Sequence, residues 1–236
     1  MAILYAGTSG WSYPAWKPQF YPAKTPANKF LQYYATRLNS VELNYTFRRF
    51  ASEKLLRGWI DATPAHFVFS VKAHQMITHI KRLRDAAEFT QSFLRSLQLL
   101  SESGKLGTIL FQLPPFLKAD PALLADFLGT LPEGLRKTFE FRHESWFNAE
   151  VYDILRRSNA ALCLAESEKL TAPEVQTAGY SYYRLRKPEY TARERQALAG
   201  KFAALRSAGS DVFCYFKHEE TPEGALYAEE LLTGAA

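Results

Sequence analysis

Five charged side chains in this sequence stand where short apolar runs end, and their types suit proton transfer on an anionic ligand. Glu140 and Glu42 can serve as general acid, general base or orienting partner. Arg142, Lys72 and Arg184 can neutralise a substrate anion through guanidinium forks or an ammonium charge. We therefore predict that Glu140 is the general acid or base, that Glu42 is its partner or orienter, and that the three cations stabilise substrate charge.

Further polar residues complete this set at other run ends: Asn44, Gln112 and Glu166. Asn44 and Gln112 are predicted to position the substrate. Because alternate residues of a strand share a face, Glu42 faces the same way as Asn44, and Glu140 the same way as Arg142. If these faces point into one opening, the polar residues form a ring whose charges nearly balance. Such a ring either binds a polar substrate or is a structural network in which the charges pair with one another.

The apolar runs that carry these residues recur along the chain, with helical periodicity between most of them. They cover residues 3–9, 40–44, 67–72, 107–112, 137–142, 160–166, 180–184 and 212–217. This alternation predicts one α/β domain over residues 1–236, a (β/α)₈ TIM-barrel-like fold with a parallel barrel and outer helices. In that fold, active sites lie at the carboxyl ends of the strands, where the polar residues fall.

The predicted helices have apolar stripes and recognisable first residues. Ser52 and Asp120 are expected to cap two of them, and Pro121 follows at a favoured first position. The longest helix is predicted over residues 85–103, and others begin after Pro26 and cover 148–158, 191–208 and 223–232. Residues 167–178, between the sixth and seventh strands, are too few for a full outer helix.

Basic and aromatic residues gather just beyond the predicted strand ends. The cations after strands seven and eight are Arg184, Arg186, Lys187, Lys217 and His218. In this fold those loops often hold phosphate, although nearby glutamates could make them a solvated basic surface. Trp11 and Trp146 directly follow strand ends and are predicted to stack on a sugar or base, the alternative being packing over the barrel.

Metal and nucleotide-cofactor chemistry have no clear sequence signature here. Lys72, His74 and His79 follow the third strand, but five histidines in the whole chain are too few for a multi-metal nuclease barrel. The chain contains no GxGxxG, GxxxxGKS/T, HExxH or GxSxG motif. We expect no metal site and leave the cofactor open. Lys72 could form a Schiff base if it is desolvated.

Composition favours a slightly basic globular protein. Its 236 residues include 29 Lys and Arg against 24 Asp and Glu, and the formal charge of +5 mildly favours anionic partners. No apolar stretch approaches the roughly 20 residues that span a bilayer, and the amino terminus lacks signal-peptide features. Cys163 and Cys214 lie inside predicted strands as buried free thiols. We expect a cytoplasmic protein without a membrane partner.

Several short motifs follow one another in a specific order: GTSGW at 7–11, ELN at 42–44, FSVK at 69–72, QLPPF at 112–116 and EFR at 140–142. This order resembles YecE-like proteins, the domain-of-unknown-function 72 family, over nearly the full chain. The resemblance implies a barrel related to the (β/α)₈ type and supplies no established activity. The chain departs from the family after three strands. Glu166 stands where Asp is common, Arg186-Lys187 where the family has His-Gly, and Lys217-His218 where it has paired asparagines.

These observations lead to one principal hypothesis and two rivals. The principal hypothesis is an enzyme acting on a small anionic substrate, phosphate- or sugar-bearing, by carboxylate acid–base chemistry at the barrel mouth. The first rival is a non-catalytic nucleic-acid-binding protein, which a steep salt dependence would distinguish. The second is a carbohydrate hydrolase using Glu42 and Glu140, which requires a carboxyl separation of about 5 to 9.5 Å.

Overall fold

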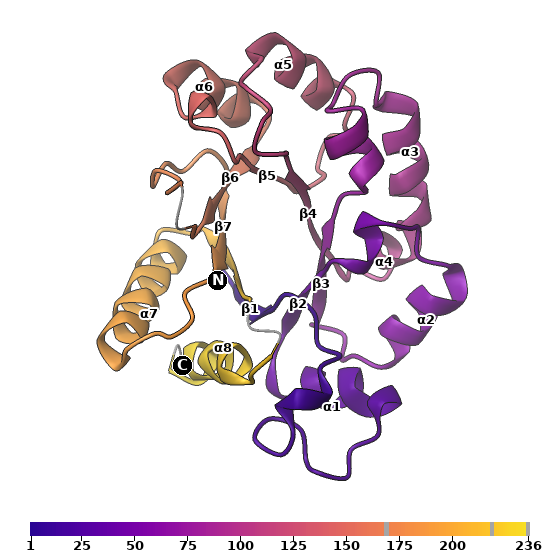
Figure 1. Cartoon of the computed structure of the whole chain (residues 1–236), viewed down its shortest axis with the longest axis vertical. Coiled ribbons are helices and arrows are strands. Elements are labelled where there is room, and N and C mark those ends of the chain that lie inside the picture. The colour runs from indigo at the N-terminus through magenta and orange to yellow at the C-terminus, as the bar shows by residue number, and fades with distance from the viewer. Residues whose placement is uncertain (168–169, 218–219, 235–236) are drawn as a thin grey trace.

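The computed structural model describes residues 1–167, 170–217 and 220–234, and its centre is a barrel of eight parallel strands (Figure 1). The strands are β1 (Leu4–Thr8), β2 (Ser40–Leu43), β3 (Val68–Lys72), β4 (Leu106–Gln112), β5 (Lys137–Glu140), β6 (Ala160–Ala165), β7 (Tyr180–Leu185) and β8 (Asp211–Phe216). Backbone pairing runs in the order β1–β8–β7–β6–β5–β4–β3–β2. The TIM-barrel-like fold class and all the predicted strands are confirmed.

Helices surround the barrel and connect most successive strands (Figure 1). They are α1 (Phe30–Arg37), α2 (Glu53–Asp61), α3 (Ala87–Ser96), α4 (Gln98–Glu102), α5 (Pro121–Gly129), α6 (Ala149–Arg157), α7 (Ala192–Ser207) and α8 (Glu223–Thr233). Short 3-10 helices cover Pro14–Trp16, Ala27–Lys29, Tyr45–Phe47 and Glu144–Trp146, and a π-helical turn covers Met76–Ile80. Ser52 and Asp120 cap α2 and α5, as predicted, by accepting hydrogen bonds from the backbone three residues on.

The predicted long helix over residues 85–103 is wrong in extent, because the chain turns at Leu97. This residue has φ −102° and ψ 5°, outside helical geometry, and it separates α3 from α4. Leu97 and Leu100 are both buried, so the turn keeps both side chains in the core. The longest described helix is α7, with 16 residues. Within the described chain, no helix has the length and apolar character that crossing a membrane requires.

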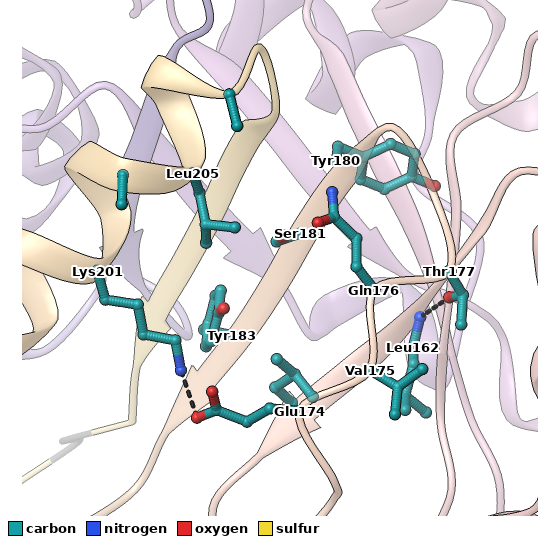
Figure 2. Close-up of a pocket in the computed structure, with 13 residues that line it drawn as sticks. Leu162, Glu174, Val175, Gln176, Thr177, Tyr180, Ser181, Tyr183, Lys201 and Leu205 are labelled. Atoms are coloured by element: carbon teal, nitrogen blue, oxygen red, sulfur yellow. Dashed lines mark hydrogen bonds and ion pairs between the residues drawn. The ribbon is translucent and has the colours of Figure 1, made fainter.

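The described residues between β6 and β7 contain no helix, as the shortness of this connection predicts. Residues 174–177 run instead along the outside of the barrel (Figure 2). There the Thr177 hydroxyl oxygen accepts from the backbone N–H of Leu162 at 2.8 Å, and Lys201 of α7 pairs with Glu174. A cavity of about 340 Å³ lies between this segment and α7. Its described lining is mostly apolar and carries no charge beyond that ion pair.

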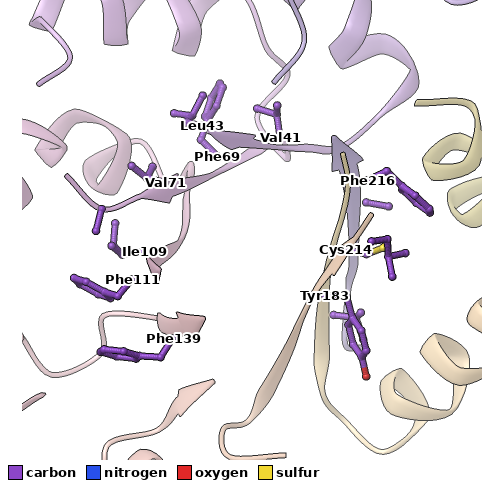
Figure 3. Packing of buried hydrophobic residues seen from close by; sticks show 14 of the residues in the cluster. Val41, Leu43, Phe69, Val71, Ile109, Phe111, Phe139, Tyr183, Cys214 and Phe216 are labelled. Carbon is purple, nitrogen blue, oxygen red and sulfur yellow. The ribbon is translucent and has the colours of Figure 1, made fainter. Parts of the chain in front are cut away.

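Strand alternation divides the core into two layers. Outward-facing side chains such as Val41, Phe69 and Phe111 point toward the surrounding helices (Figure 3). The inward faces fill the barrel with a second buried cluster: Tyr5, Val68, Leu110, Ala161, Cys163, Tyr180, Tyr182, Phe213 and Tyr215. Cys163 faces inward and Cys214 faces outward, and both are buried free thiols, as predicted. The large aromatic side chains close the interior, so this barrel is a packed core rather than a pore.

Backbone pairing is thinnest between β1 and β2, where side chains replace part of the ladder. A single parallel bridge at the carboxyl ends of the two strands joins them. Below it, the Tyr34 hydroxyl accepts from the Thr8 N–H at 2.9 Å and donates to the Ser40 carbonyl at 2.9 Å. Gly7 allows this close approach, because a Cβ there would lie 1.9 Å from the Ser40 carbonyl oxygen. The seam between β1 and β2 therefore depends on a tyrosine and a glycine.

Candidate functional site

A buried arginine joins the two predicted carboxylates. Arg184 of β7 donates from Nη1 to Glu140 Oε2 at 2.5 Å and from Nη2 to Glu42 Oε1 at 2.7 Å. All three side chains are buried and lie at the carboxyl ends of β7, β5 and β2. Alternation along the strands turns them inward, as the sequence spacing predicts. Among the described residues, Arg184 is the only cation paired with Glu42, so removing Arg184 would leave a buried carboxylate without a counter-charge.

Glu42 has a complete set of protein partners. Besides Arg184, its carboxylate accepts from the Tyr182 hydroxyl at 2.7 Å and from the Ser9 hydroxyl. Burial by itself would raise the pKa of Glu42, but the Arg184 charge and these hydrogen bonds outweigh it and lower the pKa. Glu42 is therefore an ionised group that holds its neighbours in place, with its oxygens already engaged.

Glu140 lies at the centre of the positive charge. Its Oε1 accepts from Gln112 Nε2 at 2.8 Å and from Arg186 Nη2 at 3.2 Å, and Arg142 Nε lies 3.7 Å away. Burial opposes ionisation, yet Arg184 and Arg186 overcome it and lower the pKa of Glu140 to about 2. A carboxylate with this pKa is ionised at neutral pH and is a weak base.

Lys72 is a partly buried lysine that contacts an amide and an aromatic ring. Its Nζ donates to Gln112 Oε1 at 2.8 Å and lies 4.3 Å from the centre of the Phe47 ring. Burial and the Arg184 charge lower the pKa of Lys72 to about 8, although Glu42 and Glu140 partly oppose them. Lys72 can therefore give up and take back a proton under mild conditions.

Above these groups lies a cavity of about 520 Å³, here called the mouth cavity. It is lined by Tyr13, Asn44, Tyr45, Phe47, Arg48, Arg49, Lys72, Gln112, Arg142, Arg184, Arg186 and Lys217. Seven of these residues are Arg or Lys, and no carboxylate appears in the described lining. The positive charge therefore faces the opening while the two buried glutamates lie at its base. Every predicted cation and amide of the site reaches this cavity.

Three other predicted residues lie outside the mouth cavity. Trp146 is 1% exposed and stacks on Phe141 at a ring-centre distance of 4.5 Å, in the core beneath the loops. Trp11 lines a neighbouring cavity instead. Glu166 accepts from the backbone N–H of Arg186 at 2.7 Å, so it holds the loop after β7 and does not join the polar ring.

The predicted basic cluster after β7 and β8 is only partly assembled at the mouth. Arg186 and Lys217 line the cavity, whereas Lys187 pairs with Glu194 of α7 at 2.7 Å. His218, the last member, lies outside the described residues. The cluster therefore contributes two further cations to the site in addition to Arg184.

Sequence reasoning missed Arg48 and Arg49, which line the mouth cavity beside Tyr45. They follow β2 at the end of the short 3-10 helix Tyr45–Phe47, and Arg49 lies over the Tyr45 ring at 4.9 Å. The adjacent arginines just beyond a predicted strand end were the available signal. They carry no apolar pattern, and only the path of the loop turns them toward the opening.

The histidines after β3 are engaged locally. His74 Nδ1 accepts from the Met76 N–H at 3.1 Å, and the His74 ring packs on Phe89. His79 shares a hydrogen bond of 2.9 Å with the Thr78 hydroxyl. Within the described ranges, no group of three or more His, Cys, Asp or Glu side chains is arranged to hold a metal ion.

The fold and the site define a TIM-barrel protein with a cationic pocket at the carboxyl ends of its strands. The family model described as "Protein of unknown function DUF72" matches residues 5–236. The chain belongs to this family, in agreement with the resemblance carried by its motifs.

Individual relatives agree with this assignment. The UPF0759 protein YunF of Bacillus subtilis (strain 168) is 31% identical over 161 residues, which are 64% of this chain and 55% of the relative. The chain thus spans about half the length of that relative. The crystal structure of a DUF72 family protein from Thermotoga maritima MSB8 has a TM-score of 0.84 at 25% identity and covers 98% of both chains.

A more distant structure shares only the fold. The AP endonuclease, family 2, from Brucella melitensis has a TM-score of 0.56 at 12% identity, over 99% of this chain and 98% of that chain. This likeness places the barrel among known TIM-barrel architectures.

Proposed function

We propose that this protein is an enzyme that binds a small phosphate-bearing substrate in the mouth cavity. The observation that carries the proposal is a lining of seven cationic side chains with no carboxylate in its described part. Glu42 and Glu140, below the cavity, offset only part of that charge. Arginine pairs and lysine point charges are the groups that proteins use for phosphate. A volume of about 520 Å³ suits a small molecule.

Arg142 is the proposed primary phosphate ligand. Its side chain is 39% exposed, and its Nε lies 3.7 Å from Glu140 Oε1. Among the described residues, neither terminal nitrogen of its guanidinium donates a hydrogen bond, so both can serve a ligand. Arg184, by contrast, already donates from both terminal nitrogens to carboxylates. We assign Arg184 to organising the site and Arg142 to binding.

Lys72 is the proposed proton-transfer group. A general acid or base works best when its pKa lies near the working pH, and the pKa of Lys72, lowered by burial and Arg184, is about 8. Glu140, with a pKa lowered to about 2 by Arg184 and Arg186, is poorly matched to that task. We therefore propose Glu140 and Glu42 as positioning residues that hold the arginines, a different role from the one predicted from sequence.

The carbohydrate-hydrolase rival is disfavoured by the position of Arg184. Two catalytic carboxylates need a glycosidic bond, and in one mechanism a water, between them. Here the Arg184 guanidinium bridges Glu140 and Glu42 and occupies that space. Both carboxylates are also buried below the cavity.

Nucleic-acid binding remains a second candidate, favoured by the rim of the mouth cavity. Arg48 and Arg49 are exposed there beside the exposed ring of Tyr45. Cations interleaved with aromatic rings suit a phosphodiester backbone with unstacked bases. The distant likeness to a protein named as an AP endonuclease is compatible with this candidate.

A thermal-shift and calorimetry screen tests the proposal. Inorganic phosphate, sugar phosphates and short DNA and RNA oligonucleotides are added to wild type, to Arg142→Ala and to Arg157→Ala. Arg157 is an exposed arginine in the last turn of α6 and provides the same change of charge away from the mouth. We expect a small phosphate ligand to stabilise wild type and Arg157→Ala but not Arg142→Ala.

The alternatives give different results in the same screen. If only oligonucleotides bind, with an affinity that falls steeply with salt, the nucleic-acid candidate replaces the enzyme proposal. If phosphate ligands stabilise Arg142→Ala as well as wild type, the assignment of Arg142 is wrong. A substrate found in the screen is then used for turnover assays with Lys72→Met.

A further inference from the structure

A second cavity, here called the aromatic slot, adjoins the mouth cavity. It has a volume of about 380 Å³ and is lined by Ser9, Gly10, Trp11, Ser12, Tyr13, Glu42, Leu43, Asn44, Tyr45, Leu55 and Trp59. Tyr13, Asn44 and Tyr45 line both cavities. A single ligand can therefore occupy the slot with one part and the mouth cavity with another.

Three aromatic rings shape the slot. Trp11 lies 5.7 Å from Trp59 at an interplanar angle of 89°, and Tyr45 lies 5.9 Å from Trp59 at 88°. Trp11 and Tyr45 thus both stand perpendicular to Trp59 of α2, which is almost fully buried. Such an arrangement offers flat apolar faces to a flat ligand group.

Charge in and around the slot selects a neutral ring over a cation. Aromatic boxes also bind ammonium groups, but here Arg49 already lies over the Tyr45 ring at 4.9 Å. The carboxylate in the lining, Glu42, is neutralised by Arg184 at 2.7 Å. A ligand cation would meet a positive surrounding, whereas an uncharged heteroaromatic ring would not.

Asn44 stands at the junction of the two cavities. It is exposed, and among the described residues its side-chain amide makes no hydrogen bond. An amide offers both donors and an acceptor, which suits a base edge or a sugar hydroxyl. From the aromatic slot to the mouth cavity, a ligand therefore meets aromatic rings, then the Asn44 amide, and then the cationic side chains.

We propose that the substrate is a nucleotide, with its base in the aromatic slot, its sugar beside Asn44 and its phosphate in the mouth cavity. This inference rests on the proposed function, because it takes the mouth cavity as the phosphate site. It adds that the organic group attached to the phosphate is a nucleoside. Stacking of a base on an aromatic side chain strengthens binding by about ten-fold or more.

The test compares ligands that differ only in the base. Dissociation constants are measured by calorimetry for ribose 5-phosphate and for the four common ribonucleoside monophosphates. The proteins are wild type, Trp11→Ala and Trp11→Phe. We expect at least one nucleotide to bind wild type about ten-fold more tightly than ribose 5-phosphate. Trp11→Ala should remove this preference without changing ribose 5-phosphate affinity, and Trp11→Phe should keep most of it.

Other outcomes overturn the inference at separate levels. If ribose 5-phosphate binds as tightly as every nucleotide, the slot does not bind a base, although the mouth cavity still binds phosphate. If Trp11→Ala weakens ribose 5-phosphate and nucleotides equally, Trp11 supports the loop and does not stack. If no phosphate ligand binds wild type, the proposed function fails and this inference fails with it.

Discussion

Replacing Glu140 with Gln should lower the free energy of unfolding by about 3 kcal/mol at pH 7. Glu140 is buried, and its carboxylate accepts from Arg184 at 2.5 Å and from Arg186 at 3.2 Å. These cations, working against burial, lower the pKa of Glu140 from an ordinary 4.5 to about 2. That difference corresponds to about 3 kcal/mol of preference for the charged form, which Gln cannot provide.

The pH dependence of this effect has a definite sign. The pKa of Glu140, lowered by Arg184 and Arg186, is lower in the folded than in the unfolded protein. Its contribution to stability is therefore fully present above about pH 4.5 and is lost as the pH falls toward about 2. The Glu140→Gln variant has no such carboxyl to titrate. The difference in stability between wild type and variant should shrink over that range.

Urea unfolding followed by circular dichroism measures both effects. The control is Glu53→Gln on α2, whose 68%-exposed side chain pairs with Arg57 and should contribute less than about 1 kcal/mol. For a chain of this size, a loss of about 3 kcal/mol also lowers the melting temperature by roughly 6 to 12 °C. If Glu140→Gln is no less stable than the Glu53→Gln control, Glu140 does not anchor the arginines, and its proposed positioning role is wrong.

Three further predictions concern other residues. Burial and Arg184 lower the pKa of Lys72 to about 8, so Lys72 should lose its proton at a lower pH than the exposed lysines. An NMR pH titration of lysine-labelled protein measures this, and the Lys72→Arg variant identifies the Lys72 signal. In the Gly7→Ala variant the added methyl group should keep β1 from closing onto β2, and the free energy of unfolding in urea should fall by several kcal/mol. In the control Gly129→Ala the added Cβ meets nothing within 4 Å, so the variant should be neutral or slightly stabilised. Burial raises the pKa of Cys163 and Cys214, so both should react with a thiol reagent only after unfolding, as absorbance of the released product would report.

The barrel could be predicted from sequence because the pattern that marks each strand lies within a few neighbouring residues. Each strand is a short apolar run, and alternation alone turned Glu42, Glu140 and Arg184 to the inside. The carboxyl ends of parallel strands meet on one side of the barrel, which brought Asn44 and Arg142 to the mouth cavity.

What could not be predicted depends on contacts across the barrel. Arg184 decides whether Glu140 is a reactive acid or a buried counterion. It is 44 residues away in the sequence but donates a hydrogen bond to the Glu140 carboxylate. Trp146 follows a strand end as Trp11 does, but the loop turns one into the core and the other into the aromatic slot. Glu166 also follows a strand end, as the residues of the polar ring do, but its carboxylate accepts hydrogen bonds from backbone N–H groups of the loop after β7 instead.

The seam between β1 and β2 has a consequence for how the chain is made. β1 pairs along its length with β8, through a register from Leu4 opposite Val212 to Thr8 opposite Phe216, but it meets β2 at one bridge. During synthesis β1 leaves the ribosome before β8, so β1 waits for the later strand before it gains its main backbone partner. Until then, Tyr34 and Asn39, which bond to the β1 backbone, are the groups that can retain it. A nascent chain that stops before β8 therefore exposes an unpaired, apolar strand to its surroundings.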